Sequence, residues 1–183
     1  MTIDNNTFSP KVKFVLGVIL FAVIIRVMQF LPPNFAPIGA MALFGGTYLT
    51  NKKWALALPL IALFLGDVLL EFVSPWGGFH ANMLAVYVSF ALITCIGFLL
   101  RGREQRQTIM VSSLVGSILF FLITNFSVWA TGSLFGSSVA GLGATMVAGI
   151  PFFKYTVMGD LAFNLIFFGS FAIAKWKYPV LAN

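Results

Sequence analysis

The sequence predicts an all-α integral membrane protein with six transmembrane helices and both termini in the cytoplasm. Hydrophobic residues make up 60% of the 183 residues, charged residues only 9%, and the mean hydropathy is +0.98. A soluble domain carries roughly 25% charged residues, so this chain has too few to cover itself in water. The apolar residues also form long runs between short basic clusters, which is the pattern of a multi-pass membrane protein.

Six apolar runs are expected to span the membrane in a single transmembrane domain, residues 1–183. Most are long enough, at about 1.5 Å per residue, to cross roughly 30 Å of hydrocarbon. The second run is shorter and follows three prolines, so we expect it to begin below the membrane surface, behind its neighbours. The expected spans are about residues 13–31, 37–51, 54–72, 83–100, 108–130 and 155–174.

The first run follows Lys11 and Lys13, as the apolar part of a signal peptide would. It has no small-residue cleavage pattern and leads into further spans. We therefore interpret it as a retained first helix.

A seventh apolar segment, residues 139–153, is interpreted from the distribution of charge. With six spans, nine basic residues fall on one side of the membrane and only Lys154 on the other, which makes the first side cytoplasmic. A seventh span would move Lys175 and Lys177 to the outer side, so we expect a re-entrant or surface helix there instead. The nine residues are Lys11, Lys13, Lys52, Lys53, Arg101, Arg103, Arg106, Lys175 and Lys177. The expected location is the cell's inner (cytoplasmic) membrane.

Composition also excludes several classes of function. The net charge of +6 is spread over loop clusters and not gathered in a patch, so we expect no nucleic-acid partner. The single cysteine, Cys95, rules out an intramolecular disulfide. The only histidine, His80, lies in a loop and not beside a serine at membrane depth, and no glycine-rich phosphate loop is present. We therefore expect no enzyme activity and no intrinsic cofactor.

Apart from Lys13 at the cytoplasmic start of the first span, four charged residues lie within the expected spans, all in the outer layer. A charge in hydrocarbon costs at least ~2.5–3.5 kcal/mol, so each normally faces a partner or a wet cavity. We expect a buried polar cluster of Arg26, Asp67, Glu71 and Asp160. One alternative is that Arg26 pairs with Asp67 or Asp160 only to join helices, while Glu71 is solvated. Another is proton coupling through the carboxylates.

The three outer loops, near residues 31–35, 74–82 and 125–136, combine aromatic side chains with amides and hydroxyls. An aromatic belt at the membrane interface explains the tryptophans but not the amides. An apolar cup with a few polar groups is what a small-molecule site needs, so we expect a ligand-binding cup that opens outward. Its expected lining is Asn34, Trp76, Phe79, His80, Asn82, Asn125 and Trp129.

His80 has two interpretations. One is a hydrogen-bonded histidine in a glycine-rich loop. The other is a ligand: a lone histidine is a poor site for a free metal ion, but it suffices as an axial ligand to a metal held by a macrocycle.

Four segments, 32–46, 86–93, 124–129 and 150–161, carry a resemblance that extends over about residues 15–175. The first reads Pro-Pro-Asn-Phe-Ala-Pro-Ile-Gly-Ala-Met-Ala-Leu-Phe-Gly-Gly. The chain resembles the S-components of energy-coupling-factor (ECF) vitamin transporters, and more closely a bacterial family related to the solitary cobalamin transporter BtuM. The resemblance implies an S-component-like bundle that binds a vitamin-like solute at its outer face, with cobalamin or a related corrinoid as the first candidate.

The resemblance also implies a role for the loop between the third and fourth helices. In the cobalamin member a cysteine of that loop ligates cobalt; this chain has His80 there, and Cys95 lies within a helix. His80 is thus the expected axial ligand to the cobalt of a bound corrinoid. S-components that share an ECF-type energising module dock through small residues four apart on the first helix, and this chain lacks such a pair. That favours a solitary protein. An S-component-like transporter of another vitamin, driven by an ATPase module, and a non-transporting membrane scaffold remain alternatives.

Overall fold

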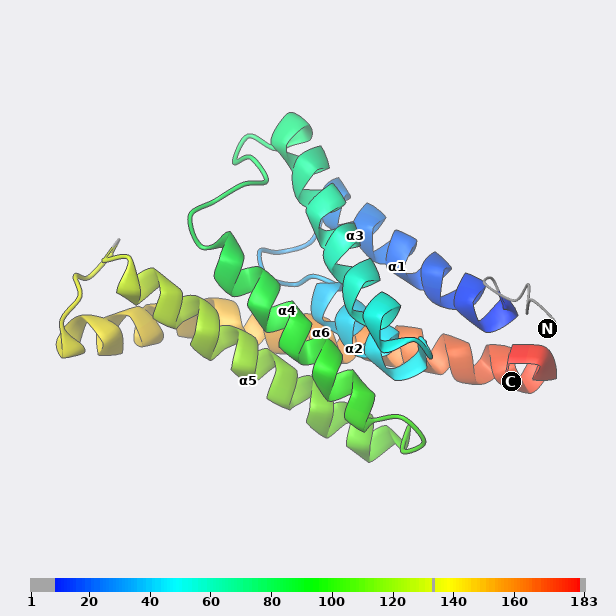
Figure 1. Ribbon diagram of the computed structural model, residues 1–183. Coiled ribbons are helices and arrows are strands. Elements are labelled where there is room, and N and C mark those ends of the chain that lie inside the picture. The colour runs from blue at the N-terminus through cyan, green and yellow to red at the C-terminus, as the bar shows by residue number, and fades with distance from the viewer. Residues whose placement is uncertain (1–8, 133, 182–183) are drawn as a thin grey trace.

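Six α-helices and one short 3-10 turn form the computed structural model, which describes residues 9–132 and 134–181 (Figure 1). The expected all-α class is confirmed, since these residues contain no strand. The helices are α1 (Pro10–Met28), α2 (Ile38–Tyr48), α3 (Lys52–Val73), α4 (Met83–Leu99), α5 (Arg106–Ala130) and α6 (Val139–Lys177), and the turn is Pro179–Leu181.

Three of the described helices, α3, α5 and α6, are long and apolar enough to cross a membrane. The helices α2 and α4 are apolar but shorter. Figure 1 shows the start of α1, the end of α6 and the α2–α3 and α4–α5 connections on one side of the bundle. The loops that follow α1, α3 and α5 lie towards the other side. The connections at the first side carry the basic clusters of the sequence.

The last helix differs from the expectation. The segment 139–153 and the expected span 155–174 are not separate elements, because α6 continues through Pro151 over 39 residues. A proline inside a helix removes one hydrogen bond, a loss that packing against neighbouring helices compensates in membrane proteins. Here α6 packs along α5, and Gly149 lies so close to α5 that an added Cβ would come within 2.9 Å of the Phe121 ring. At about 1.5 Å per residue α6 is roughly 58 Å long, far more than a bilayer core.

The short helix α2 lies at the centre of the bundle, where it contacts all five other helices. All eleven of its residues are buried, which agrees with the expectation that it packs behind its neighbours. Gly46 of α2 meets Gly97 of α4, where a Cβ on Gly97 would lie 2.9 Å from the Gly46 Cα. Small residues at a crossing allow two helix backbones this close approach.

Aromatic rings fill the space between α2 and α6. Phe44 packs edge-on against Phe168 at 5.2 Å and Phe171 at 5.8 Å, and Tyr48 lies 4.3 Å from the Phe171 ring. Edge-to-face contacts of this kind stabilise a core beyond the area that they bury.

Arg101 closes the C-terminal end of α2. Its guanidinium donates hydrogen bonds to the carbonyl oxygens of Gly46 (3.0 Å), Leu49 (2.6 Å) and Thr50 (3.2 Å), and it lies 4.7 Å from the Phe98 ring. Carbonyl groups at a helix end have no partner within the helix, and a cation there is favoured by the helix dipole. One side chain therefore satisfies several acceptors of a buried helix end.

Candidate ligand cavity

A cavity of about 590 Å³ is lined by residues of the loops 29–37 and 74–82. Both loops lie away from the side of the bundle that carries the chain ends (Figure 1). This volume is within the range of roughly 300–1,000 Å³ that is typical of small-molecule sites. Side chains from α1, α3, α4, α5 and α6 and the first turn of α2 complete its walls. Among the residues singled out in the sequence, five line it: Arg26, Asn34, Trp76, His80 and Asp160.

The loop 29–37 forms one wall. Gln29 ends α1 with φ 52°, and Asn34 has φ 65°, a left-handed conformation that asparagine tolerates better than most residues. A turn is closed where the Phe35 N–H donates to the Pro32 carbonyl at 3.0 Å. The Gln29 amide also donates to the Ser74 hydroxyl at 3.0 Å, which ties this loop region to the next one.

Glu71 shapes the loop 74–82. Its Oε2 accepts hydrogen bonds from the backbone N–H groups of Gly78 (2.8 Å) and Phe79 (3.1 Å), so the loop folds back over the end of α3. Gly78 packs on the Asp67 backbone with no room for a Cβ. Glu71 is exposed. The structure therefore places it outside the buried cluster expected from the sequence, as an anchor for the loop that carries Trp76 and His80.

Arg26 forms an ion pair with Asp67 that links α1 to α3. The Tyr87 hydroxyl of α4 donates to the other oxygen, Asp67 Oδ2, at 2.7 Å. The Asp67 side chain is only 4% exposed, whereas that of Arg26 is 20% exposed and lines the cavity. Asp67 thus has two partners, as a buried carboxylate requires.

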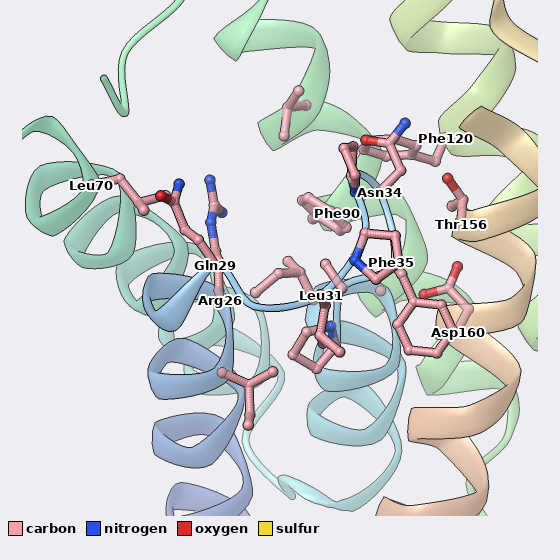
Figure 2. A pocket seen from close by; sticks show the side chains of 18 of the residues that line it. Arg26, Gln29, Leu31, Asn34, Phe35, Leu70, Phe90, Phe120, Thr156 and Asp160 are labelled. Carbon is pink, nitrogen blue, oxygen red and sulfur yellow. The ribbon is translucent and has the colours of Figure 1, made fainter. Parts of the chain in front are cut away.

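Asp160 lies on the other side of the cavity and does not join this pair. Figure 2 shows Arg26 and Gln29 on the α1 side, Asp160 and Thr156 on the α6 side, and Leu31 and other residues of the loop between them. The expected polar cluster is therefore divided, with the Arg26–Asp67 pair on one side of the cavity and Asp160 on the other.

Asp160 is 5% exposed, yet it has partners of its own. The Ser117 hydroxyl of α5 donates to its Oδ2 at 2.6 Å, and the backbone N–H of Ala40, in the first turn of α2, also hydrogen-bonds to it. Gly39 makes this approach feasible, since a Cβ there would collide with the carboxylate. The first N–H groups of a helix lack internal partners, and the helix dipole favours an anion beside them. Asp160 therefore caps α2 from a different helix.

Four residues of the expected cup do not line this cavity. The Phe79 ring packs on Phe64 at 6.1 Å, and Asn82 accepts a hydrogen bond from the Ser127 hydroxyl at 2.9 Å. The third expected loop is partly helical, because α5 continues to residue 130. Asn125 donates to the Phe121 carbonyl at 2.8 Å, and Trp129 Nε1 donates to the Ser138 carbonyl at 2.8 Å.

Two polar lining residues were missed by the sequence argument, Gln29 and Thr156. Each lies one helical turn from a residue that the sequence did predict for the polar cluster. Gln29 is three residues after Arg26, and Thr156 is four residues before Asp160. Residues at these spacings share a helix face, so extending each choice by one turn would have found them.

Within the described part of the chain, no group of three histidine, cysteine, aspartate or glutamate side chains comes together in a way that could hold a metal ion. His80 is the one imidazole at the cavity, and it is exposed. An exposed lone imidazole at a cavity rim can donate or accept one hydrogen bond, or ligate a metal that arrives with its own ligands.

The long apolar helices and the polar cavity at one end of the bundle indicate a helical membrane protein. The chain belongs to DUF6580, a family of unknown function, whose match covers residues 6–181. Neither the curated proteins nor the solved structures contain a match to the chain.

Proposed function

We propose that this protein binds a small vitamin-like solute from the outer face of the cell's inner membrane and mediates its uptake. The single observation that carries the proposal is the cavity, which combines polar side chains of two loops and two helices at the side of the bundle away from the basic clusters. By the positive-inside rule those clusters are cytoplasmic, so the cavity faces outward.

The membrane arrangement that we propose has six spans and cytoplasmic termini. Its support is the nine-to-one division of basic residues and the position of both helical chain ends on one side of the bundle. Since α2 is only eleven residues long, we propose that the loop 29–37, which lines the cavity, completes its span.

A corrinoid is the first candidate for the solute. His80 and Trp76 lie at the cavity from the same loop, so an imidazole is available as an axial ligand beside an aromatic surface. A corrinoid is larger than the ligands that a cavity of about 590 Å³ encloses, so we propose that only part of it enters. Another vitamin with an energising ATPase module as partner is the alternative for the same site.

Uptake of radiolabelled cyanocobalamin tests the proposal. The host should lack its own corrinoid transporter and any ECF module. Accumulation above a vector control supports a solitary corrinoid transporter. If the host accumulates none, and the purified protein neither carries nor binds a corrinoid, the corrinoid assignment is wrong.

A further inference from the structure

A second cavity, of about 550 Å³, lies between α5 and α6 on the side of the basic clusters. Its walls are mostly apolar, and three charged side chains, Glu104, Arg106 and Lys175, belong to its lining. The polar residue deeper in its wall is Asn164 of α6. We name it the inner cavity, and we name the cavity of about 590 Å³ the outer cavity. The two share no lining residue, so they are separate spaces.

Four buried polar residues cross the interface between α5 and α6, and we name them the polar seam. Ser113 and Ser117 lie one turn apart on α5, and Asp160 and Asn164 lie one turn apart on α6. Their exposed fractions are all 5% or less. Polar groups are costly inside a membrane protein unless they serve one another or a wet path.

The seam is hydrogen-bonded in two steps. Ser117 donates to Asp160 at 2.6 Å, and its hydroxyl also lies 3.1 Å from the Ser113 carbonyl. One turn further on, Asn164 Nδ2 donates to the Ser113 hydroxyl at 2.9 Å. Because Asp160 lines the outer cavity and Asn164 lines the inner one, the seam reaches both.

One acceptor of the seam is left over. Asn164 Oδ1 is buried, and no residue that the structure describes donates a hydrogen bond to it. A buried acceptor without a partner is destabilising, so such an atom in a native protein calls for a donor that is not part of the chain. Asn164 itself belongs to the lining of the inner cavity, so the inner cavity is the nearest space that could hold such a donor.

We propose that the polar seam is a hydrated path between the two cavities and that the inner cavity is the inward-facing stage of transport. This inference rests on the proposed uptake function and specifies the chemistry of the solute. The hydroxyl groups, the Asn164 Nδ2 and one Asp160 oxygen are already paired within the seam, and Asn164 Oδ1 is the acceptor left without a donor. The solute therefore carries at least one N–H or O–H donor that this acceptor can bind.

Thiol accessibility tests the seam without a known solute. In a Cys95→Ala background, Asn164→Cys is treated with the membrane-impermeant cation MTSET in right-side-out and inverted vesicles. The control is Ile166→Cys, two residues on in α6, half exposed and in the lining of neither cavity. Since the thiolate is the reacting form and needs water, we expect modification from the inner face at least ~10-fold faster than the control.

Three results would overturn the proposal: no modification from either face, as for a dry seam or a cavity filled by a lipid chain; modification from the outer face only; or rates equal to the control. Ser113→Cys, a nearly isosteric change, gives the same measurement if Asn164→Cys expresses poorly.

The variant Asn164→Leu distinguishes passage along the seam from binding in the outer cavity. It removes the hydrogen-bond acceptor of the seam and fills about the same space. We expect cyanocobalamin uptake to fall at least ~10-fold while binding to the purified protein is unchanged, since Asn164 is outside the outer cavity. Unchanged uptake would overturn the seam. If wild type does not bind cyanocobalamin, the proposed substrate fails, and the MTSET rates still decide the inference.

Discussion

Asp160 of α6 occupies the space that a side chain at Gly39 of α2 would need. This contact puts a carboxyl group at the N-terminal end of the buried helix α2, while Arg101 puts a cation at its C-terminal end. A hydrogen-bond acceptor beside the first N–H groups and a cation beside the last carbonyl groups both satisfy the unpaired groups of a helix end. A helix of eleven residues is marginal by itself, so α2 depends on these contacts and on packing. The outer cavity is built around the first turn of this helix.

Gly39→Ala should destabilise the protein, because the added methyl group collides with the Asp160 carboxylate. Overpacking of this kind costs about 1–3 kcal/mol, or a fall in Tm of roughly 5 °C for a chain of this size. Thermal unfolding in detergent measures it. Gly169→Ala is the control, since a Cβ there meets no atom within 4 Å. Equal Tm values for the two variants would contradict the contact.

Asp160→Leu should lower stability more than Asp160→Asn. The amide keeps a hydrogen-bonding group beside Ser117 and the Ala40 N–H, and it loses only the interaction of a carboxyl group with the helix end, at most about 0.3–2 kcal/mol. Leucine also leaves the donors without an acceptor, a further ~1–3 kcal/mol. Denaturation of both variants under the same conditions provides the comparison. A leucine variant as stable as the asparagine variant would show that Asp160 does not cap α2.

Arg101→Lys should be destabilising, although the charge is kept. A lysine ammonium cannot reproduce the planar fork that reaches three carbonyl groups and also packs on Phe98. We expect a loss of about 2 kcal/mol, from hydrogen bonds to a charged group. Arg103→Lys in the same connection is the matched control, since Arg103 is exposed. The prediction fails if the two substitutions have the same effect on Tm.

The Arg26–Asp67 pair should behave as a coupled unit. Asp67→Asn alone leaves the largely buried guanidinium without its anion, which costs up to about 3–5 kcal/mol of unfolding free energy. The cost is lower than this limit because the Arg26 side chain is 20% exposed and solvent partly screens its charge. The double change Arg26→Gln with Asp67→Asn should recover part of the loss. A double-mutant cycle on unfolding free energies measures the coupling. Additive effects would mean that the two charges do not interact.

The all-helical fold and the helix positions could be predicted because hydropathy and charge clusters are local properties of the chain. The continuity of α6 could not be predicted, because a proline such as Pro151 and three nearby glycines usually mark a helix boundary. Packing along α5 keeps this helix continuous. Asn125 looked like a loop residue, but its amide bonds to the Phe121 carbonyl within α5. A side chain that hydrogen-bonds to the backbone one turn earlier needs no partner outside the helix, so a polar residue can remain within it.

Part of the candidate site could also be predicted, because the composition of a loop is a local property of the sequence. Asn34, Trp76 and His80 belong to short loops whose composition reveals them, and they line the cavity. That Asp160 caps α2 depends on two segments about 120 residues apart, and no local pattern contains that information. Glu71 was expected in the buried polar cluster because it lies one helical turn after Asp67. Its hydrogen-bond partners are instead backbone N–H groups of the following loop.

The central claim is that the outer cavity binds a corrinoid through His80, and a spectral titration tests it most directly. Aquocobalamin is added to the purified protein, and the visible spectrum is compared for wild type, His80→Ala and the loop control Phe79→Ala, whose ring packs on Phe64 outside the cavity. We predict that wild type and Phe79→Ala shift the spectrum as imidazole replaces the axial water, and that His80→Ala does not. A wild-type protein that leaves the spectrum unchanged, or a His80→Ala variant that shifts it equally, would contradict the claim.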